Sequence, residues 1–254
     1  MPISRTPQIV ALGGGGFSME RGNTLMDDYV LALAVRERPR VCFLPTASGD
    51  ADHYIVRFYR AFGAAACEPS HISLFRRDDG APDIHDHLLR SDIVYVGGGS
   101  VVSLLGAWRA HGLDDTLREA WRRGVILCGV SAGSLCWFTS AVSAFHGKPQ
   151  RVDGLGLLPW SNCVHFDGEP SRDETFRRLL ADGMCSGYAV EDGAALHFRG
   201  PRLERVVSSR PGARAYRMRL RGGRIERRAL EVAYLGDMGD RELDVPPRAV
   251  SLAA

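Results

Sequence analysis

The feature that most constrains the fold is an alternation of short apolar runs with helical segments through the first two-thirds of the chain. The apolar runs are short and rich in β-branched residues, which predicts strands, whereas the segments between them space apolar residues three and four apart. Such alternation favours parallel strands joined by right-handed crossovers, and hence an open, doubly wound α/β sheet. The predicted strands are 8–12, 40–44, 68–74, 93–96 and 125–130, and the predicted helices are 25–36, 54–62, 101–108 and 113–123.

Beyond residue 185 the pattern changes to short strand-like runs separated by tight turns, after a helix predicted at 173–180. These runs indicate C-terminal antiparallel strands, which we expect to extend the same sheet. They cover 187–192, 195–198, 203–208, 215–220 and 224–232. Because the sequence shows no internal repeat, low-complexity segment or linker, we expect residues 1–254 to form a single α/β domain.

Three glycine-rich turns follow predicted strands, at 13–16, at 97–99 and around Ser131. Ligands of open α/β sheets bind outside the carboxyl ends of the strands. We therefore expect these three turns to line one crevice. The first turn lacks the glycine spacing of a dinucleotide fingerprint, and the chain contains no phosphate-binding P-loop motif, so neither a nucleotide cofactor nor a metal is predicted.

The third turn has the sequence of a nucleophile elbow, with Gly129 and Gly133 two residues before and after Ser131. In such an elbow a strand turns at once into a helix, so the serine stands clear of the fold and only small residues fit beside it. An apolar run precedes Ser131, and residues 132–142 are compatible with a helix. Ser131 is therefore the candidate nucleophile of a hydrolase.

Acyl transfer also needs amide donors for the oxyanion of the tetrahedral intermediate. The N–H of Ala132 is the first candidate, because it follows the nucleophile at the start of a helix. A second donor is expected from Gly98 or Gly99, in the turn after the preceding strand.

The general base is expected to be a histidine close to the serine. His165 is the preferred candidate, because it follows a strand-like segment and precedes a polar loop. His197 is the competitor, although it lies in the middle of a predicted strand, where a histidine is more often packed than catalytic.

Composition excludes several classes of protein. The formal net charge is +2, which gives no reason to expect nucleic acid, and no apolar run approaches the length of a membrane span. The six cysteines form no metal-ligand pattern and are expected to be reduced. Residues 1–5 contain no signal-peptide core, so we predict a cytoplasmic protein. An arginine-rich run at 214–228 is interpreted as the solvated face of a hairpin, with a phosphate-binding stripe as the less favoured alternative.

Several motifs, in this order, resemble the peptidase E (α-aspartyl dipeptidase) family of serine peptidases, which is related to cyanophycinase. They are Phe-Leu-Pro-Thr-Ala-Ser at 43–48, Tyr-Val-Gly-Gly-Gly at 95–99, Gly-Val-Ser-Ala-Gly-Ser at 129–134, His-Phe-Asp at 165–167 and Gly-Tyr-Ala-Val-Glu-Asp-Gly-Ala-Ala-Leu at 187–196. The resemblance implies a fold like that of class I glutamine amidotransferases, with Ser131 as nucleophile and His165 as base. It also implies cleavage of short peptides, including those with N-terminal aspartate, without a cofactor.

The sequence departs from the family pattern in two places. Peptidase E carries its third catalytic residue, an aspartate, in a stretch that corresponds to 144–147, where this chain has no carboxylate. The acid behind His165 must come from elsewhere, and the candidates are Asp192, Glu191, Asp167 and Asp153, with Asp192 preferred because an acidic turn there resembles that of cyanophycinase relatives.

The second departure is Cys163-Val164 before His165, in place of Asn-Pro, which indicates a different pocket wall. Arg172 falls where the family has an arginine able to pair with a substrate carboxylate, and a bidentate guanidinium suits that role. An ordinary surface arginine at a helix start is the alternative.

The leading hypothesis is therefore a serine peptidase that hydrolyses dipeptides or short peptides through an acyl-enzyme on Ser131. One alternative is an α/β-hydrolase esterase, which requires a histidine late in the chain and so would use His197. Another is an amidotransferase-like protein that binds a small molecule or peptide and has lost its catalytic triad. The only partner predicted is a short peptide substrate, and the protein is expected to be a monomer or homodimer.

Overall fold

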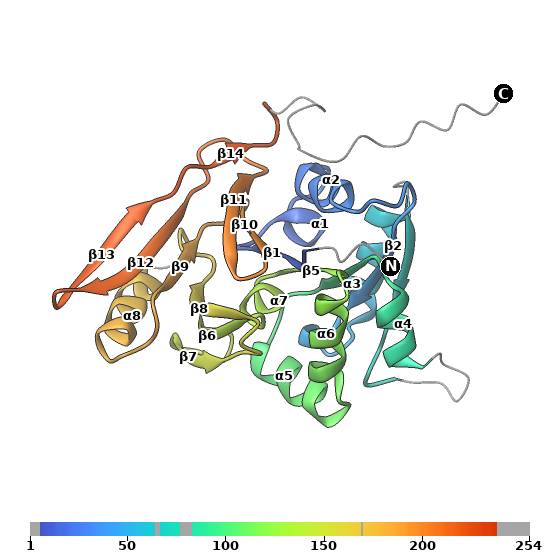
Figure 1. Ribbon diagram of the computed structural model, residues 1–254, viewed down its shortest axis with the longest axis horizontal. Helices are drawn as coiled ribbons and strands as arrows, with labels where there is room; N and C mark the ends of the chain where they lie inside the picture. Colours follow the sequence, from blue (N-terminus) through green and yellow to red (C-terminus); the bar gives the residue numbers. More distant parts are fainter. Residues whose placement is uncertain (1–5, 64–66, 77–82, 169, 238–254) are drawn as a thin grey trace.

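The computed structural model describes residues 6–63, 67–76, 83–168 and 170–237 (Figure 1). Residues 1–5, from which the absence of a signal peptide was predicted, lie outside the described residues. Within the described ranges, no helix combines the length and the apolar character required to cross a membrane.

A mostly parallel sheet forms the centre of the fold, in the strand order β14-β11-β10-β1-β5-β4-β2-β3. The strands β1, β5, β4, β2 and β3 run parallel to one another, while β10 is antiparallel to both β1 and β11. The bounds are β1 (Gln8–Leu12), β2 (Arg40–Leu44), β3 (Glu68–His71), β4 (Ile93–Val96), β5 (Ile126–Val130), β10 (Ala194–Arg199), β11 (Arg202–Ser208) and β14 (Ala233–Tyr234). The predicted α/β fold, with antiparallel strands late in the chain, is confirmed.

Helices cover both faces of this sheet, because its buried strands send alternate side chains to opposite sides. In β2, Val41 and Phe43 pack among α1 (Gly16–Met19), α2 (Leu25–Ala32) and α3 (Asp52–Phe62). Cys42 and Leu44 face the other side, towards α4 (Ile84–Arg90), α5 (Val101–Ala110) and α6 (Leu113–Arg122). A short 3₁₀ turn, η1 (Thr46–Ser48), follows β2.

A second sheet lies beside the first, in the order β13-β12-β9-β8-β6-β7 (Figure 1). Its strands are β6 (Phe138–Ser143), β7 (Gln150–Asp153), β8 (Leu158–Cys163), β9 (Gly187–Val190), β12 (Ala215–Arg221) and β13 (Arg224–Ala229). Helix α8 (Pro170–Ala181) packs on one face of this sheet, where Phe176 and Leu180 contact Met218 and Ala189 in one buried cluster.

This second sheet corrects two expectations. The helix predicted over 132–142 is wrong beyond its first turn: α7 (Ala132–Leu135) ends at once and the chain continues as β6. The spacing of apolar residues in that stretch is compatible with a helix or with a strand. The pairing of β6 with β7 and β8 stabilises the strand. The expectation that all the late strands extend the central sheet is also wrong for β9, β12 and β13, which belong to the second sheet.

Candidate active site

Three candidate residues lie just beyond the carboxyl ends of three strands, drawn from both sheets. Ser131 follows β5 of the central sheet, whereas His165 and Asp192 follow β8 and β9 of the second sheet. Strands β8 and β9 are parallel neighbours, with Cys163 opposite Ala189, so their ends lie side by side. The site therefore forms where the ends of the two sheets meet.

The backbone at Ser131 has the strained geometry of a nucleophile elbow. Its φ is 55° and its ψ is −115°, outside the usual regions for a residue with a side chain. A Cβ on Gly129 would lie 2.3 Å from the carbonyl oxygen of Gly133, and one on Gly133 would lie 2.2 Å from that of Val96. Both glycines are thus required by close backbone approach, as the elbow pattern predicts.

Ser131, His165 and Asp192 form one chain of hydrogen bonds. The Oγ of Ser131 lies 2.9 Å from Nε2 of His165, and Nδ1 of His165 lies 2.5 Å from Oδ1 of Asp192. About a quarter of each of the last two side chains is exposed, 23% and 24%. Asp192 thus accepts the Nδ1 proton, which leaves Nε2 free to accept the hydroxyl proton of Ser131.

The surroundings of Asp192 keep it ionised. Burial raises the pKa of this carboxyl, but the hydrogen bond to His165 and the charges of His165, Arg210 and Arg172 outweigh burial and lower its pKa below the usual value. An ionised carboxylate at this position favours the imidazolium that forms when His165 takes up a proton.

The other acids considered for this position are engaged elsewhere. Glu191 accepts hydrogen bonds from the Arg214 amide and the Tyr216 hydroxyl, each at 2.9 Å. Asp153 is paired with Arg151 at 2.9 Å. Asp167 supports the site indirectly, because its Oδ1 accepts a hydrogen bond of 2.9 Å from the Asp192 amide and so fixes the acidic turn.

The stretch in which peptidase E carries its aspartate has a different role here. His146 lies in it, and its Nε2 contacts the hydroxyl of Ser100 at 2.7 Å. The same hydroxyl accepts a hydrogen bond from the Ser103 amide and caps α5.

The glycine turn at 13–16 packs directly against the acidic turn. A Cβ on Gly14 would lie 2.1 Å from Oδ1 of Asp192 and 3.0 Å from Cε1 of His165. The Gly14 carbonyl also accepts a hydrogen bond of 3.0 Å from the Gly193 amide. Sequence analysis predicted that this turn lies in the crevice, but missed that it positions the His165–Asp192 pair.

The amide donors near Ser131 differ in their availability. Gly98 is adjacent, since a Cβ there would lie 3.4 Å from the Cβ of Ser131, but its N–H already donates to the Tyr54 hydroxyl at 3.0 Å. An oxyanion contact from Gly98 therefore requires that bond to be shared or exchanged. Gly99 follows with φ 138°, and Ala132 is the first residue of α7, where an amide has no acceptor within its own helix.

His197, the competing base, belongs to the core. It is 2% exposed, its Nδ1 lies 2.6 Å from the Tyr29 hydroxyl, and its Nε2 lies 2.9 Å from Oε1 of Gln8. Burial lowers the pKa of His197 to about 3, with the charges of Arg199 and Arg205 acting in the same direction. Both ring nitrogens are thus occupied within the fold, which argues against a catalytic histidine.

Two further side chains lie close to the site. Arg172 is in the first turn of α8, and its charge lowers the pKa of Asp192. Cys163, at the end of β8, is fully buried, and burial raises the pKa of its thiol to about 12, so it does not compete with Ser131 as a nucleophile. Among the described residues, no three His, Cys, Asp or Glu side chains are grouped to hold a metal ion.

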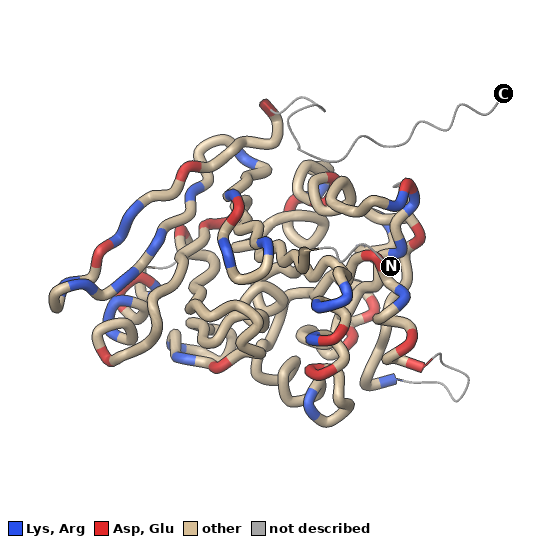
Figure 2. The backbone as a smooth tube through the Cα atoms, in the orientation of Figure 1, with Lys and Arg blue, Asp and Glu red and all other residues tan. Residues whose placement is uncertain are grey.

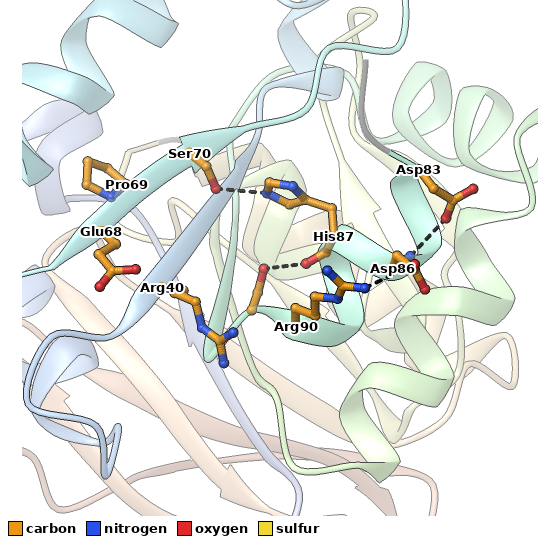
Figure 3. A pocket seen from close by; sticks show the side chains of 9 residues that line it. Arg40, Glu68, Pro69, Ser70, Asp83, Asp86, His87 and Arg90 are labelled. Atoms are coloured by element: carbon orange, nitrogen blue, oxygen red, sulfur yellow. Dashed lines mark hydrogen bonds and ion pairs between the residues drawn. The ribbon is translucent and has the colours of Figure 1, made fainter. Parts of the chain in front are cut away.

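The cavity of about 410 Å³ in Figure 3 lies far from this chemistry. It is at the amino ends of β2 and β3, and several of its polar side chains are paired with one another. Ser70 contacts Nε2 of His87 at 2.9 Å, and Arg90 pairs with Asp86 at 3.4 Å. A second cavity, of about 520 Å³, is lined by Ser18, Arg21, Arg57 and Arg60 among others, beside the glycine turn. Ser18 accepts a hydrogen bond from Tyr54, which in turn contacts Gly98 next to Ser131.

The chain is similar to known peptidases. The chain is 48% identical over 230 residues to the uncharacterized peptidase YgaJ of Bacillus subtilis, covering 90% of this chain and 99% of that protein. It is 28% identical over 189 residues to peptidase E of Streptomyces coelicolor, covering 70% of this chain and 74% of that one.

A solved structure has the same fold. The crystal structure of a peptidase from an acI-B1 actinobacterium superposes with a TM-score of 0.68 at 17% identity, over 90% of this chain and 96% of that one. The family model of peptidase family S51 matches residues 9–206, which include Ser131, His165 and Asp192. The chain therefore belongs to peptidase family S51.

Proposed function

We propose that the protein is a serine peptidase that hydrolyses dipeptides or short peptides through an acyl-enzyme on Ser131. The observation that carries this proposal is the continuous hydrogen-bonded chain from Ser131 Oγ through His165 to Asp192. Family membership supports peptidase chemistry, and the elbow geometry supports serine as its nucleophile.

In the proposed mechanism, Ser131 attacks the scissile carbonyl carbon while Nε2 of His165 accepts the hydroxyl proton. Asp192 holds the imidazole in the required tautomer and stabilises its protonated form. The amides of Ala132 and Gly99, with Gly98 after release from Tyr54, donate to the oxyanion. His165 then gives its proton to the leaving amine, and water hydrolyses the acyl-enzyme by the same steps.

The proposed substrates include peptides with N-terminal aspartate. Arg172 supports this preference, because its positive charge acts on Asp192 and so reaches the site. A guanidinium binds a carboxylate with two parallel hydrogen bonds, which gives both affinity and orientation. We further propose that the enzyme is cytoplasmic, a monomer or homodimer, and active without a cofactor, nucleic acid or membrane.

Two alternatives have less support. An esterase that uses His197 would need this histidine to leave its contacts with Tyr29 and Gln8 in the core. A binding protein with a decayed triad was suggested by the missing carboxylate near residue 146, but the contact of 2.5 Å between Asp192 and Nδ1 of His165 supports Asp192 as the missing acid.

Covalent labelling with a fluorophosphonate tests the nucleophile. The wild type is expected to be labelled at one serine, Ser131→Ala to be unlabelled, and Ser103→Ala, on the exposed side of α5, to be labelled like the wild type. Labelling that persists in Ser131→Ala would refute the assignment of Ser131 as the nucleophile.

Hydrolysis of Asp-Leu and Ala-Leu dipeptides tests the substrate preference. Arg172→Ala is expected to reduce kcat/KM for Asp-Leu at least tenfold more than for Ala-Leu. Arg178→Ala, an exposed arginine of the same helix paired with Asp182, is the matched control and is expected to leave the ratio unchanged. Equal rates for both dipeptides in the wild type would remove the aspartate preference and leave the serine mechanism standing.

A further inference from the structure

The hairpin of β12 and β13 is rich in arginine (Figure 2), and its register places most of these arginines on one face. Alternate residues share a face of a strand, and the register pairs Arg217 with Arg228, Arg219 with Glu226 and Arg221 with Arg224. The six residues on this face therefore comprise five arginines and one glutamate. The opposite face carries Met218, which packs beneath α8, with Tyr216 and Ile225 against the same cluster.

A cavity of about 590 Å³ opens on the arginine face, between the hairpin and the edge of the central sheet. We call it the arginine cavity. Its lining includes Arg202, Arg217, Arg219, Arg228, Trp160 and Tyr188, and no Asp or Glu is among the described residues that line it.

Arg217 is held in place by two aromatic rings. Its guanidinium carbon lies 4.0 Å from the ring centre of Trp160 and 4.5 Å from that of Tyr188. Within the part of the chain that the structure describes, the buried Nη1 of Arg217 has no hydrogen-bond acceptor. A buried donor without an acceptor is costly, and a guanidinium fixed by stacking loses little freedom when its planar fork binds a carboxylate or phosphate.

The placement of the arginines is costly without an anion. Like charges directly opposite each other on neighbouring strands destabilise a sheet, and Arg217 faces Arg228 in this way. The one acid on this face, Glu226, pairs with Arg219 at 3.0 Å. Protection of a sheet edge does not explain Arg217, because β12 is paired on both sides.

The cavity of Figure 3 provides a contrast within the same molecule. Its two arginines are both neutralised, Arg40 by Asp92 at 3.1 Å and Arg90 by Asp86 at 3.4 Å. The arginine cavity differs from the cavity of Figure 3 in this respect, because no ion pair neutralises Arg217 or Arg228 among the described residues.

We propose that the arginine cavity binds a small ligand carrying two or more adjacent anionic oxygen groups, of the phosphate or carboxylate kind. Arginine forks bind such groups with paired hydrogen bonds, and the volume lies in the range of small-molecule sites. The site is separate from the serine chemistry: Trp160 and Tyr188 belong to β8 and β9, whose far ends lead to His165 and Asp192.

Isothermal titration with sodium tripolyphosphate and with citrate, at 0.15 M NaCl, tests the proposal. We expect saturable binding of one tripolyphosphate per chain, with Kd raised at least tenfold by Arg217→Met and by Arg228→Met. Arg228 is exposed, so its variant keeps the test valid if Arg217→Met does not fold. Binding of tripolyphosphate alone assigns a phosphate ligand, and equal binding of citrate assigns the broader oxyanion class.

Arg221→Met is the matched control, because it removes the same charge from the same face outside the cavity. It is expected to change Kd less than twofold. The proposal is overturned if neither anion binds at millimolar concentration, or if all three variants weaken binding equally, which would mean a general attraction of anions to a basic surface. Fluorophosphonate labelling of Ser131 in Arg228→Met should match the wild type, so a failure here is distinguishable from a failure of the proposed mechanism.

Discussion

Replacing Gly14 by alanine tests whether the glycine turn positions the catalytic acid. The backbone at Gly14 lies outside the left-handed region, so alanine adds only a methyl group. That methyl carbon would lie 2.1 Å from Oδ1 of Asp192 and 3.0 Å from Cε1 of His165. The carboxylate must therefore withdraw by about 1.3 Å to reach the ordinary contact distance of 3.4 Å, which breaks its short hydrogen bond to Nδ1 of His165.

The size of the expected effect follows from what that bond does. A displacement of about 1 Å at a catalytic group costs roughly 10²-fold in rate, and loss of the correct histidine tautomer costs roughly 10⁴-fold. We therefore expect kcat of Gly14→Ala to fall by about 10²- to 10⁴-fold, which corresponds to roughly 3 to 5.5 kcal/mol of activation free energy. Folding should be much less affected, because the clash falls on two partly exposed side chains.

The assay is steady-state hydrolysis of a dipeptide, together with thermal unfolding of each variant. Gly106→Ala is the matched control, since Gly106 lies inside α5 and nothing is within 4 Å of the added methyl. It is expected to retain full kcat. If Gly14→Ala keeps more than a tenth of wild-type kcat while folded, the proposed dependence of His165 on a fixed Asp192 is refuted.

Two further predictions concern buried ionisable groups. Burial raises the pKa of Asp27 from 3.8 to about 7, so its contribution to stability is complete below about pH 4 and declines as the pH rises to 7. Between pH 5 and 8 the free energy of unfolding should fall by an amount on the order of 2–3 kcal/mol for this reason. Urea unfolding of Asp27→Asn should lack this fall, and the same dependence of the unfolding free energy on pH in the wild type and in Asp27→Asn would contradict the prediction. His197→Ala should lower stability by roughly 2–4 kcal/mol, because it leaves a cavity and deprives the Tyr29 hydroxyl of a partner. Ser131 should still react with a fluorophosphonate in folded His197→Ala but not in His165→Ala, and the reverse pattern would contradict the assignment.

The middle of the central sheet could be predicted because four of its strands, β1, β2, β4 and β5, are short apolar runs. Buried parallel strands need apolar residues on both faces, which produces such runs. The second sheet gave weaker signals. Strand β8 carries the buried polar residues Ser161 and Asn162, whose side chains donate hydrogen bonds to partners distant in sequence: the Ser161 hydroxyl to the Cys185 carbonyl, and Nδ2 of Asn162 to the Ser134 hydroxyl. No local pattern predicts such partners.

The site was predictable to a similar extent. Ser131 could be recognised because glycines lie two residues before and after it, as in a nucleophile elbow. His165 could be recognised because the motif around it resembles a family pattern. The preference for Asp192 over Glu191 comes from the resemblance to an acidic turn and not from the residues alone, because neighbours in a turn differ in the direction of their side chains, which the sequence does not show. Contacts with residues far along the chain decide it, namely Gly14 against Asp192 and Tyr216 with Glu191.

The division of the site between two sheets has a consequence for the stage of synthesis at which the proposed activity could arise. Ser131 belongs to a sheet whose strand β1 has β10 as its outer neighbour, and β10 begins only at residue 194. A nascent chain that has released β5 thus holds its nucleophile without a base or an acid. In the folded protein the acidic turn lies between β9 and β10, and its Gly193 amide donates to the Gly14 carbonyl beyond β1. Under the proposed mechanism, a chain synthesised only as far as β5 would therefore be inactive, because it lacks both His165 and Asp192.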